Sequence, residues 1–299
     1  WLTDRQHPLT ARVTVNRFWQ SLFGMGLVKT AEDFGSQGSP PLYPELLDWL
    51  ALRFLDSGWD TKSLIKTIVM SQTYRQRSLG DHDLMTDDPE NMLLARGPRF
   101  RLQAEMIRDN VLASSGLLQQ QLGGPSVNPY EMTESFKPAK ITEGTGVYRR
   151  SLYTHWRRSG PPPALLAFDA PRRAVCTARR ERTDSPLQPL ILLNGTQYVE
   201  AARVLGELLY QSSQGSLPVM IRQGCLRCLS RLPDPRETEI FTHLYQEQLA
   251  HFEKHPMQAE DLLKIGLAAR SGNIPAPEAA AATILAQAFL NHDEAVVKR

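Results

Sequence analysis

The stretch DPRETEIFTHLYQEQLAHFEKH, residues 234–255, is the clearest local signal for secondary structure in the chain. Asp234 stands at an N-cap position, Pro235 follows at the first helical position, and Glu237 completes a capping box. The cap carboxylate accepts from first-turn amides that otherwise lack a partner, so this order of residues favours a helix start. Pro256 is expected to close the helix, because proline cannot continue it. The stretch therefore predicts a long helix ending at about His255.

Helical periodicity and turn residues extend this prediction along most of the chain. Leu46, Leu47, Leu50 and Phe54 follow i, i+3/i+4 spacing, which places them on one buried stripe. Asp60 is placed to cap the helix that follows it, and Ser185 with Pro186 to start another. Further helices are predicted over residues 9–23, 43–55, 62–74, 102–118, 185–194, 195–210 and 279–290.

The helical period is lost over residues 125–185. The run Pro161–Pro163 must be extended, because each proline fixes φ and restricts the residue before it. Residues 147–156 (VYRRSLYTHW) are rich in aromatic and β-branched side chains and predict a strand. We therefore expect a mainly α, multi-helix bundle-like domain with a small β or irregular insertion around residues 125–185.

No linker or low-complexity segment divides the chain. Residues 1–299 are therefore predicted to form a single domain, with residues 1–124 and 186–299 as two lobes joined by the irregular segment 125–185. Because the chain starts at Trp1 and not at Met, we expect it to be a processed piece whose targeting signal lies upstream.

Composition narrows the class of protein. A length of 299 residues with 41% hydrophobic content suffices for a buried core, so we expect a soluble globular chain. Thirty-four basic against thirty-two acidic residues leave a net charge of +2, so no global field draws the chain to nucleic acid or membrane. No stretch reaches the roughly eighteen apolar residues of a membrane span. Any electrostatic function must therefore be local.

One segment concentrates cationic and aromatic side chains. Between residues 149 and 182 nine arginines stand against only Asp169 and Glu181: Arg149, Arg150, Arg157, Arg158, Arg172, Arg173, Arg179, Arg180 and Arg182. Guanidinium groups bind carboxylate, sulfate or phosphate in planar, bidentate fashion, and aromatic faces stack on sugar rings or bases. The candidate ligand-binding residues are Arg149, Arg150, Tyr153, His155, Trp156, Arg157, Arg179, Arg180 and Arg182. Two interpretations stay open: an anionic-ligand or partner surface, or structural pairing with carboxylates of other helices.

The cysteines give no clear redox or metal signal. Neighbouring arginines would lower the pKa of an exposed Cys176 thiol, with His155 as the nearest base in sequence, but a buried, inert thiol is the favoured interpretation. Cys225 and Cys228 have the spacing of a redox pair or half a zinc site, yet no second pair follows at zinc-site spacing. Because they share an apolar helical face with Ile221, core packing is expected for both.

A stripe of imidazoles is the one candidate for a metal site. His243, Glu247, His251 and His255 recur every four residues on the helix 234–255, so two imidazoles and a carboxylate could hold a metal ion. A solvated helix face explains the same stripe, and the HExxH arrangement is absent. We therefore expect no metal, with this stripe as the exception to test.

Other polar motifs are expected to be structural. No complete catalytic set, glycine-rich phosphate loop or dinucleotide fingerprint is recognisable, so whether the chain is an enzyme stays open. Intrahelical ion pairing accounts for Glu105, Arg108 and Asp109, and backbone capping accounts for Gln188 and Asn194. The same structural interpretation is given to Asn16, Arg17, Trp19, Gln20, Glu32, Asp33, Phe34 and Gly35.

Three ordered segments, residues 7–54, 148–194 and 288–299, resemble the planctomycete PSD-one family, a domain of unknown function. The resemblance implies a C-terminal domain of exported proteins, with a cytochrome c-type domain and a second planctomycete-specific domain of the same polypeptide as partners. It also implies an extracytoplasmic location, in the periplasm or at the cell surface. Haem c is then expected only in the neighbouring domain, because Leu229 follows Cys228 where a haem attachment motif needs His.

Three hypotheses of function follow. The first is a helical module that docks to neighbouring domains or binds an anionic ligand through the arginine and aromatic segment. The second is a carbohydrate-active, oxidoreductase-linked enzyme acting on sulfated or acidic polysaccharide, an analogy from the domain company. The third is nucleic-acid binding, against which an exported setting argues.

Overall fold

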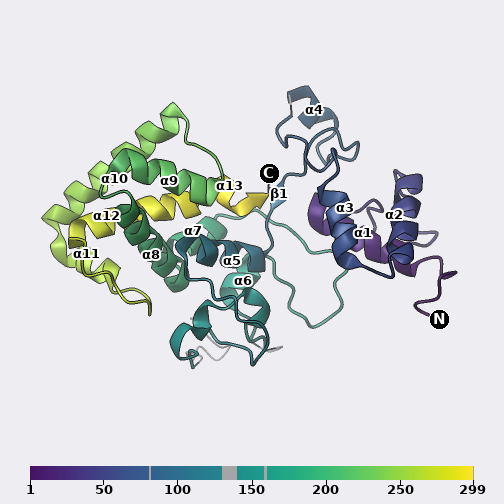
Figure 1. Ribbon diagram of the computed structural model, residues 1–299, viewed down its shortest axis with the longest axis horizontal. Coiled ribbons are helices and arrows are strands. Elements are labelled where there is room, and N and C mark those ends of the chain that lie inside the picture. Colours follow the sequence, from purple (N-terminus) through teal and green to yellow (C-terminus); the bar gives the residue numbers. More distant parts are fainter. Residues whose placement is uncertain (81, 130–139, 158–159, 299) are drawn as a thin grey trace. The chain divides into compact units, whose positions relative to one another are not determined.

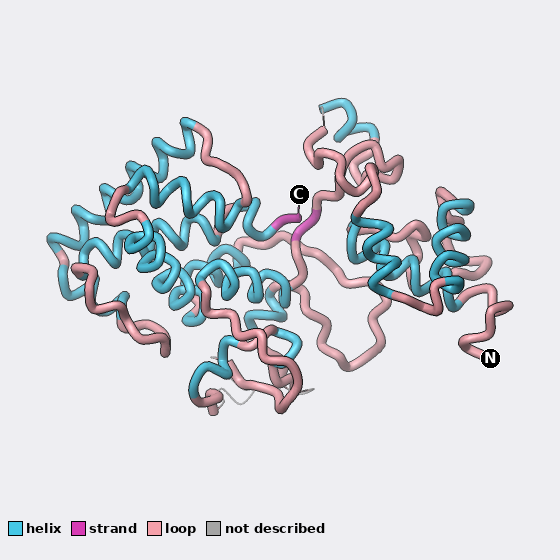
Figure 2. The backbone as a smooth tube through the Cα atoms, viewed as in Figure 1, coloured by secondary structure: helices cyan, strands magenta, loops and turns pink. Residues whose placement is uncertain are grey.

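The computed structural model describes residues 1–80, 82–129, 140–157 and 160–298 (Figures 1 and 2). Helices dominate these ranges, and their strands are the short β1 (Phe100–Arg101) and β2 (Val297–Lys298), which pair antiparallel. The mainly α class is thus confirmed. No helix in the described ranges is both long enough and apolar enough to span a bilayer.

The chain divides into two compact units. Unit 1 comprises residues 1–101, 176–180 and 297–299, and unit 2 comprises residues 102–175 and 181–296. The expectation that residues 1–299 form one domain stays a prediction.

Unit 1 contains α1 (Thr10–Phe23), α2 (Pro44–Asp56), α3 (Thr61–Val69) and α4 (His82–Asp87) besides the two strands. The predicted stripe of α2 is buried against α1 and α3, and Asp60 caps α3 by accepting from the amides of Lys62 and Ser63. The helix α3 ends before Tyr74, where the sequence predicts its end. It stops earlier because the Ser71 hydroxyl donates to the Ile68 carbonyl and accepts from the Tyr74 amide. The core of unit 1 includes Val15, Trp19, Phe23, Leu47, Leu50, Phe54, Leu64 and Ile68.

Unit 2 contains the remaining helices. They are α5 (Ala104–Ser115), the 3₁₀ turns η1 (Gly144–Tyr148) and η2 (Ser151–Tyr153), α6 (Pro163–Ala167), α7 (Leu187–Asn194), α8 (Thr196–Ser212), α9 (Leu217–Leu229), α10 (Pro235–Lys254), α11 (Pro256–Leu263), α12 (Ala276–Leu290) and α13 (Asp293–Val296). The alanine-rich α12 packs against α8, α9, α10 and α11, so it forms the centre of this unit. Its approach to α8 is close because Gly206 has no side chain, and a Cβ there would meet the Ala282 backbone at 2.6 Å.

The ends of α10 and α7 test the predicted caps. The Asp234 carboxylate accepts from the Glu237 amide, the Glu237 side chain accepts from the Asp234 amide, and α10 ends before Pro256, as predicted. Ser185, by contrast, does not cap α7: its carbonyl, not its hydroxyl, accepts from Gln188, and Pro186 is the N-cap.

The predicted strand over residues 147–156 is wrong. The segment consists of η2 and the end of η1, and it makes only single bridges, at Arg149 and Thr154. Side chains of α5 replace a partner strand, because Arg108 donates to the Val147 carbonyl and the Ser151 amide donates to Asp109. Aromatic and β-branched residues here reflect burial and not a ladder.

A polar ladder on α8 holds the loop of residues 265–271. Buried Glu200 accepts from the amides of Leu267 and Ala268, each at 2.6 Å. One turn on, Arg203 donates to the Ala268 carbonyl at 2.6 Å and pairs with Glu207 at 3.2 Å. Gly266 adopts φ +100° beneath Glu200, where a Cβ would lie 2.4 Å from the glutamate side chain. The loop is therefore built onto side chains of one helix.

Arg231 ties the start of α10 to α13, and this predicts an acid-sensitive contact. It pairs with Glu237 and with Glu294, each at 2.6 Å, and the hydrogen bond from Arg231 lowers the pKa of Glu237 from 4.5 to about 2. Because the folded pKa lies below the unfolded one, this stabilisation is present above pH 4.5 and lost as the pH falls toward 2. Arg231→Ala should lower the unfolding free energy by about 1–2 kcal/mol at pH 7 and by much less near pH 2.5.

Urea unfolding at the two pH values measures this difference. Arg236→Ala, an exposed position on the same helix, is the matched control and should change the unfolding free energy by less than about 0.5 kcal/mol. An Arg231→Ala deficit that is equal at both pH values would contradict the assignment.

Candidate functional site

The arginine-rich segment is held to unit 2 by two side chains of α5. The buried Arg108 guanidinium donates to the Val147 carbonyl at 2.8 Å, to the Arg149 carbonyl at 3.0 Å and to Gln197 at 2.6 Å. Asp109 accepts from the Ser151 amide at 2.7 Å. Arg108 and Asp109 lie 3.7 Å apart within α5, but pairing along the helix does not account for them fully, since both reach across to a segment some forty residues away. They fix the backbone from which the candidate side chains project.

Arg149 is a structural residue. Its guanidinium is buried, donates to the carbonyls of Pro125 at 2.8 Å, Gln121 at 3.1 Å and Gly123, and lies 3.8 Å from the centre of the Tyr153 ring. The Tyr153 hydroxyl accepts from the Gly123 amide at 2.8 Å. Together Arg149 and Tyr153 clamp the loop of residues 121–125, and the partners of Arg149 are carbonyls and not the carboxylates expected.

Arg150 is paired with a carboxylate. Its Nε lies 3.4 Å from Asp109, while about half of its side chain is exposed. The charge of Arg150 is therefore largely compensated within unit 2.

The arginine surface, defined here as Arg157, Arg172 and Arg173 around Trp156, is different. The Trp156 indole donates to the Arg172 carbonyl at 3.3 Å, and the Arg173 guanidinium lies 4.6 Å from the centre of the indole ring. All three arginines are exposed, and none has a carboxylate partner in the part of the chain that the structure describes. The Arg173 guanidinium therefore lies over an anchored indole, while Arg157 follows Trp156 in the chain and Arg172 is joined to it through its carbonyl.

The backbone beneath this surface is fixed on both sides. The His155 amide donates to the Val127 carbonyl at 2.7 Å, and the His155 ring lies 3.0 Å from the Ser126 hydroxyl. On the other side, Asp169 accepts from the Thr183 amide and hydroxyl, which closes the base of the loop that carries Arg172 and Arg173. Arg173 itself sits at φ +57°, a strained conformation for a residue other than glycine.

The other predicted arginines are divided between the two units. Arg179 and Arg180 belong to unit 1, and Arg182 belongs to unit 2 beside Thr183. Arg158 lies outside the described residues. The predicted candidates therefore sort into a clamp, an ion pair and an exposed surface, and Arg172 and Arg173 were not among them.

Arginines occupy one face of each of the two aromatic rings, Tyr153 and Trp156, in this region. Arg149 covers one face of Tyr153, Arg173 lies over Trp156, and Trp156 also packs against the core of unit 2. Stacking of sugars or bases on these two faces would need the arginines to move. Guanidinium groups, not ring faces, are what this surface offers a ligand.

The cysteines occupy different surroundings. Cys225 and Cys228 lie in the core of unit 2, as expected, and burial raises the pKa of their thiols to about 11 and about 12. Cys176 is exposed, so the expectation of a buried thiol there is wrong.

The imidazole stripe of α10 is solvated and does not converge. His243 lies 3.7 Å from Glu247, while His251 contacts Gln258 at 2.9 Å and the ring of His255 at 4.7 Å. Across the described ranges, no three side chains of His, Cys, Asp or Glu gather as metal ligands would.

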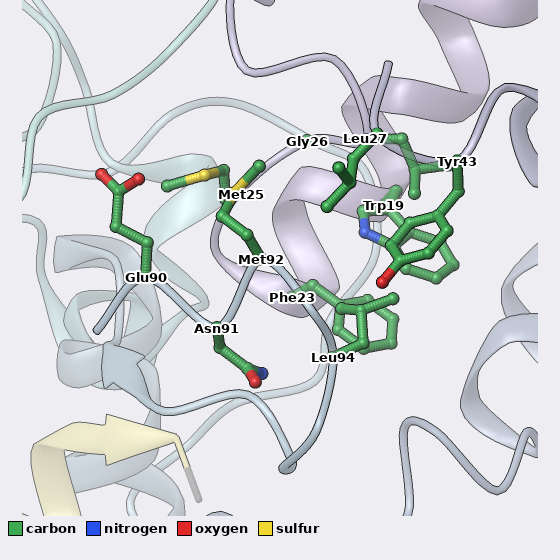
Figure 3. Close-up of a pocket in the computed structure, with 11 residues that line it drawn as sticks. Trp19, Phe23, Met25, Gly26, Leu27, Tyr43, Glu90, Asn91, Met92 and Leu94 are labelled. Atoms are coloured by element: carbon green, nitrogen blue, oxygen red, sulfur yellow. The ribbon is translucent and has the colours of Figure 1, made fainter. Parts of the chain in front are cut away.

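A recess in unit 1 lies between α1 and the residues after α4 (Figure 3). Figure 3 shows Trp19 and Tyr43 on the side opposite Glu90. The volume of this recess, about 20 Å³, holds little more than a water molecule. Its polar residues are engaged, because Glu90 pairs with Lys29 at 2.7 Å and the Asn91 amide donates to the Arg96 carbonyl.

The polar residues of the opening motif are structural, as expected for Asn16. Its amide donates to the Val28 carbonyl at 3.1 Å and accepts from the Val28 amide at 2.9 Å. A Cβ on Gly26 would lie 2.7 Å from this amide, so glycine is required there. A second recess, of about 270 Å³, lies between residues 5–12 and α2, and its arginines are paired with Asp48 and Asp56.

Comparison with known proteins adds a family and no activity. No curated protein and no solved structure matches the chain. A family model described as PSD1, protein of unknown function (DUF1553), matches residues 1–245, which include α1 to α9 and the arginine surface. The chain therefore belongs to the PSD1 family of proteins of unknown function.

Proposed function

We propose that this chain is a binding module that holds an anionic partner on the arginine surface of unit 2. The observation that carries the proposal is that Arg157, Arg172 and Arg173, exposed on the two segments that Trp156 joins, have no carboxylate partner among the described residues. Uncompensated charges that are placed together by a rigid scaffold favour a complementary partner.

Preorganisation supports this function over a merely solvated cluster. The indole of Trp156 is anchored both in the core and on the Arg172 carbonyl, so the two arginine-bearing segments keep their spacing. Less conformational entropy is then lost when a ligand binds. The strained φ of Arg173 is tolerated by the same anchoring.

The hypothesis of a carbohydrate-active, oxidoreductase-linked enzyme has weaker support than the binding function. Ser126 and His155 are in hydrogen-bond contact, but among the described residues no carboxylate orients His155 through its second ring nitrogen. A nucleophile and a base alone do not make a hydrolase site. Because Ser126 is not part of the arginine surface, Ser126→Ala should leave the binding of an anionic partner to that surface unchanged.

The setting of the chain is a further part of the proposal and rests on the family resemblance. We propose an extracytoplasmic location, beside a cytochrome c-type domain that carries haem c and a second planctomycete-specific domain. The sequence of the whole polypeptide decides this: an upstream part without a Cys-x-x-Cys-His motif would contradict it.

Removal of the surface arginines tests the binding function. Arg172→Ala and Arg173→Ala should each weaken binding of dextran sulfate or poly-glutamate about tenfold at low salt, because a charge-assisted contact is lost. Affinity should also fall steeply as salt rises. Titration calorimetry on the full chain measures both effects.

Arg150→Ala provides the matched control. This arginine is equally basic and lies in the same segment, but Asp109 already compensates it, so its loss should change affinity less than about twofold. Equal effects of Arg150→Ala and Arg173→Ala, or no binding of either probe, would refute the proposal.

A further inference from the structure

We infer that the anionic partner is a protein, which docks through a segment that carries carboxylates beside apolar side chains. This inference rests on the proposed function and names the class of its partner. The segments that form and support the arginine surface also carry exposed apolar side chains, which a site for a polar polysaccharide does not require.

Three large apolar side chains are exposed on the segments that form and support this surface. The exposed fraction is 82% for Leu122, 73% for Leu152 and 79% for Val175. Val175 follows Arg173 by two residues, and Leu152 precedes Tyr153. Leu122 precedes Gly123, which the Tyr153 hydroxyl and Arg149 hold.

These segments lie side by side because hydrogen bonds join them. The Val127 amide donates to the Tyr153 carbonyl at 2.8 Å, which joins residues 121–127 to residues 149–157. Trp156 in turn donates to the Arg172 carbonyl, which joins residues 149–157 to the loop that ends at Val175. The two leucines and the valine therefore project from segments that hydrogen bonds join to those that carry the arginines.

Arginine and aromatic side chains are enriched at protein interfaces, and exposed aliphatic side chains add apolar surface that a protein partner can cover. A polysaccharide would instead stack on aromatic faces, and here Arg149 and Arg173 occupy one face each of Tyr153 and Trp156. Apolar side chains gain from leaving water only against another apolar surface. A partner that matches both features carries carboxylates, which guanidinium groups bind in bidentate fashion, next to aliphatic residues.

Two synthetic peptides of equal length test the inference on the full chain. One repeats Glu-Glu-Leu and the other repeats Glu-Glu-Ser, and dextran sulfate serves as a purely polar polyanion. We expect the leucine peptide to bind about tenfold more tightly than the serine peptide, as measured by fluorescence anisotropy. Arg173→Ala should weaken both peptides.

Substitution of the apolar side chains separates the two kinds of contact. Leu152→Ser and Val175→Ser should remove the preference for the leucine peptide and leave the affinity for dextran sulfate unchanged. Leu226→Ser, an exposed leucine of α9, is the control and should change neither. All three positions are exposed, so their circular dichroism spectra should match the parent.

The outcomes separate the inference from the function beneath it. Equal affinity for both peptides, or tighter arginine-dependent binding of dextran sulfate or single-stranded DNA, would overturn the inference and leave anion binding intact. Binding that Arg173→Ala does not weaken, or no binding at all, would remove the proposed function and the inference together.

Discussion

Glu200→Ala is expected to lower the unfolding free energy of unit 2 by about 3–5 kcal/mol, one of the two largest effects in the chain. Glu200 has no exposed surface, and one of its oxygens accepts from the Tyr148 hydroxyl at 2.7 Å and from two backbone amides at 2.6 Å. Removal of the carboxylate leaves these donors without their acceptor, each at a cost of about 1–3 kcal/mol when buried. The substitution therefore removes hydrogen bonds to η1 and to the loop of residues 265–271 at the same time.

Chemical denaturation followed by circular dichroism measures this loss. Glu239→Ala, an exposed glutamate of α10, is the control and should change the unfolding free energy by less than about 0.5 kcal/mol. Glu200→Gln keeps an acceptor oxygen and should fall between the two. A Glu200→Ala protein as stable as the control would show that the ladder does not hold the loop.

The second large effect concerns thiol reactivity. At pH 8, pKa values of about 11 and about 12 leave roughly a thousandth of Cys225 and a ten-thousandth of Cys228 as thiolate, the form that reacts. Both thiols are also buried in the core, whereas Cys176 is exposed. We therefore expect native protein to react at one thiol, Cys176, and the other two to react at least about a hundredfold more slowly.

Titration with a chromogenic disulfide reagent checks this expectation. Native protein should release one equivalent rapidly and unfolded protein three, and Cys176→Ser should release none in the native state. Rapid reaction of a second native thiol would restore the redox or zinc interpretation of Cys225 and Cys228.

Helix starts could be predicted from the sequence because their chemistry is local. Asp60 and Asp234 each accept from amides two or three residues away, so neighbouring residues contain the whole signal. Residues 147–156 were misassigned because their backbone partners, Arg108 and Asp109, lie on a helix some forty residues away. Local β propensity cannot detect such partners.

The sequence shows the cluster of arginines, but it does not show which of them are structural and which are exposed. Arg149 and Arg173 look alike in sequence, and only the fold shows that one meets carbonyls and the other solvent and an indole. The ladder on α8 was missed altogether. Its signal was present, since Glu200, Arg203 and Glu207 recur at helical spacing on an otherwise apolar face.

That ladder also sets how freely the loop of residues 265–271 can vary. The hydrogen bonds from Glu200, Arg203 and Glu207 to this loop, within the described residues, go to its amides and carbonyls, so they do not depend on most side chains there. Gly266 is the exception, because its φ and the nearby glutamate exclude a Cβ. Over evolutionary time the loop can therefore drift in sequence and keep its shape, while selection for that shape acts on the helix beneath it.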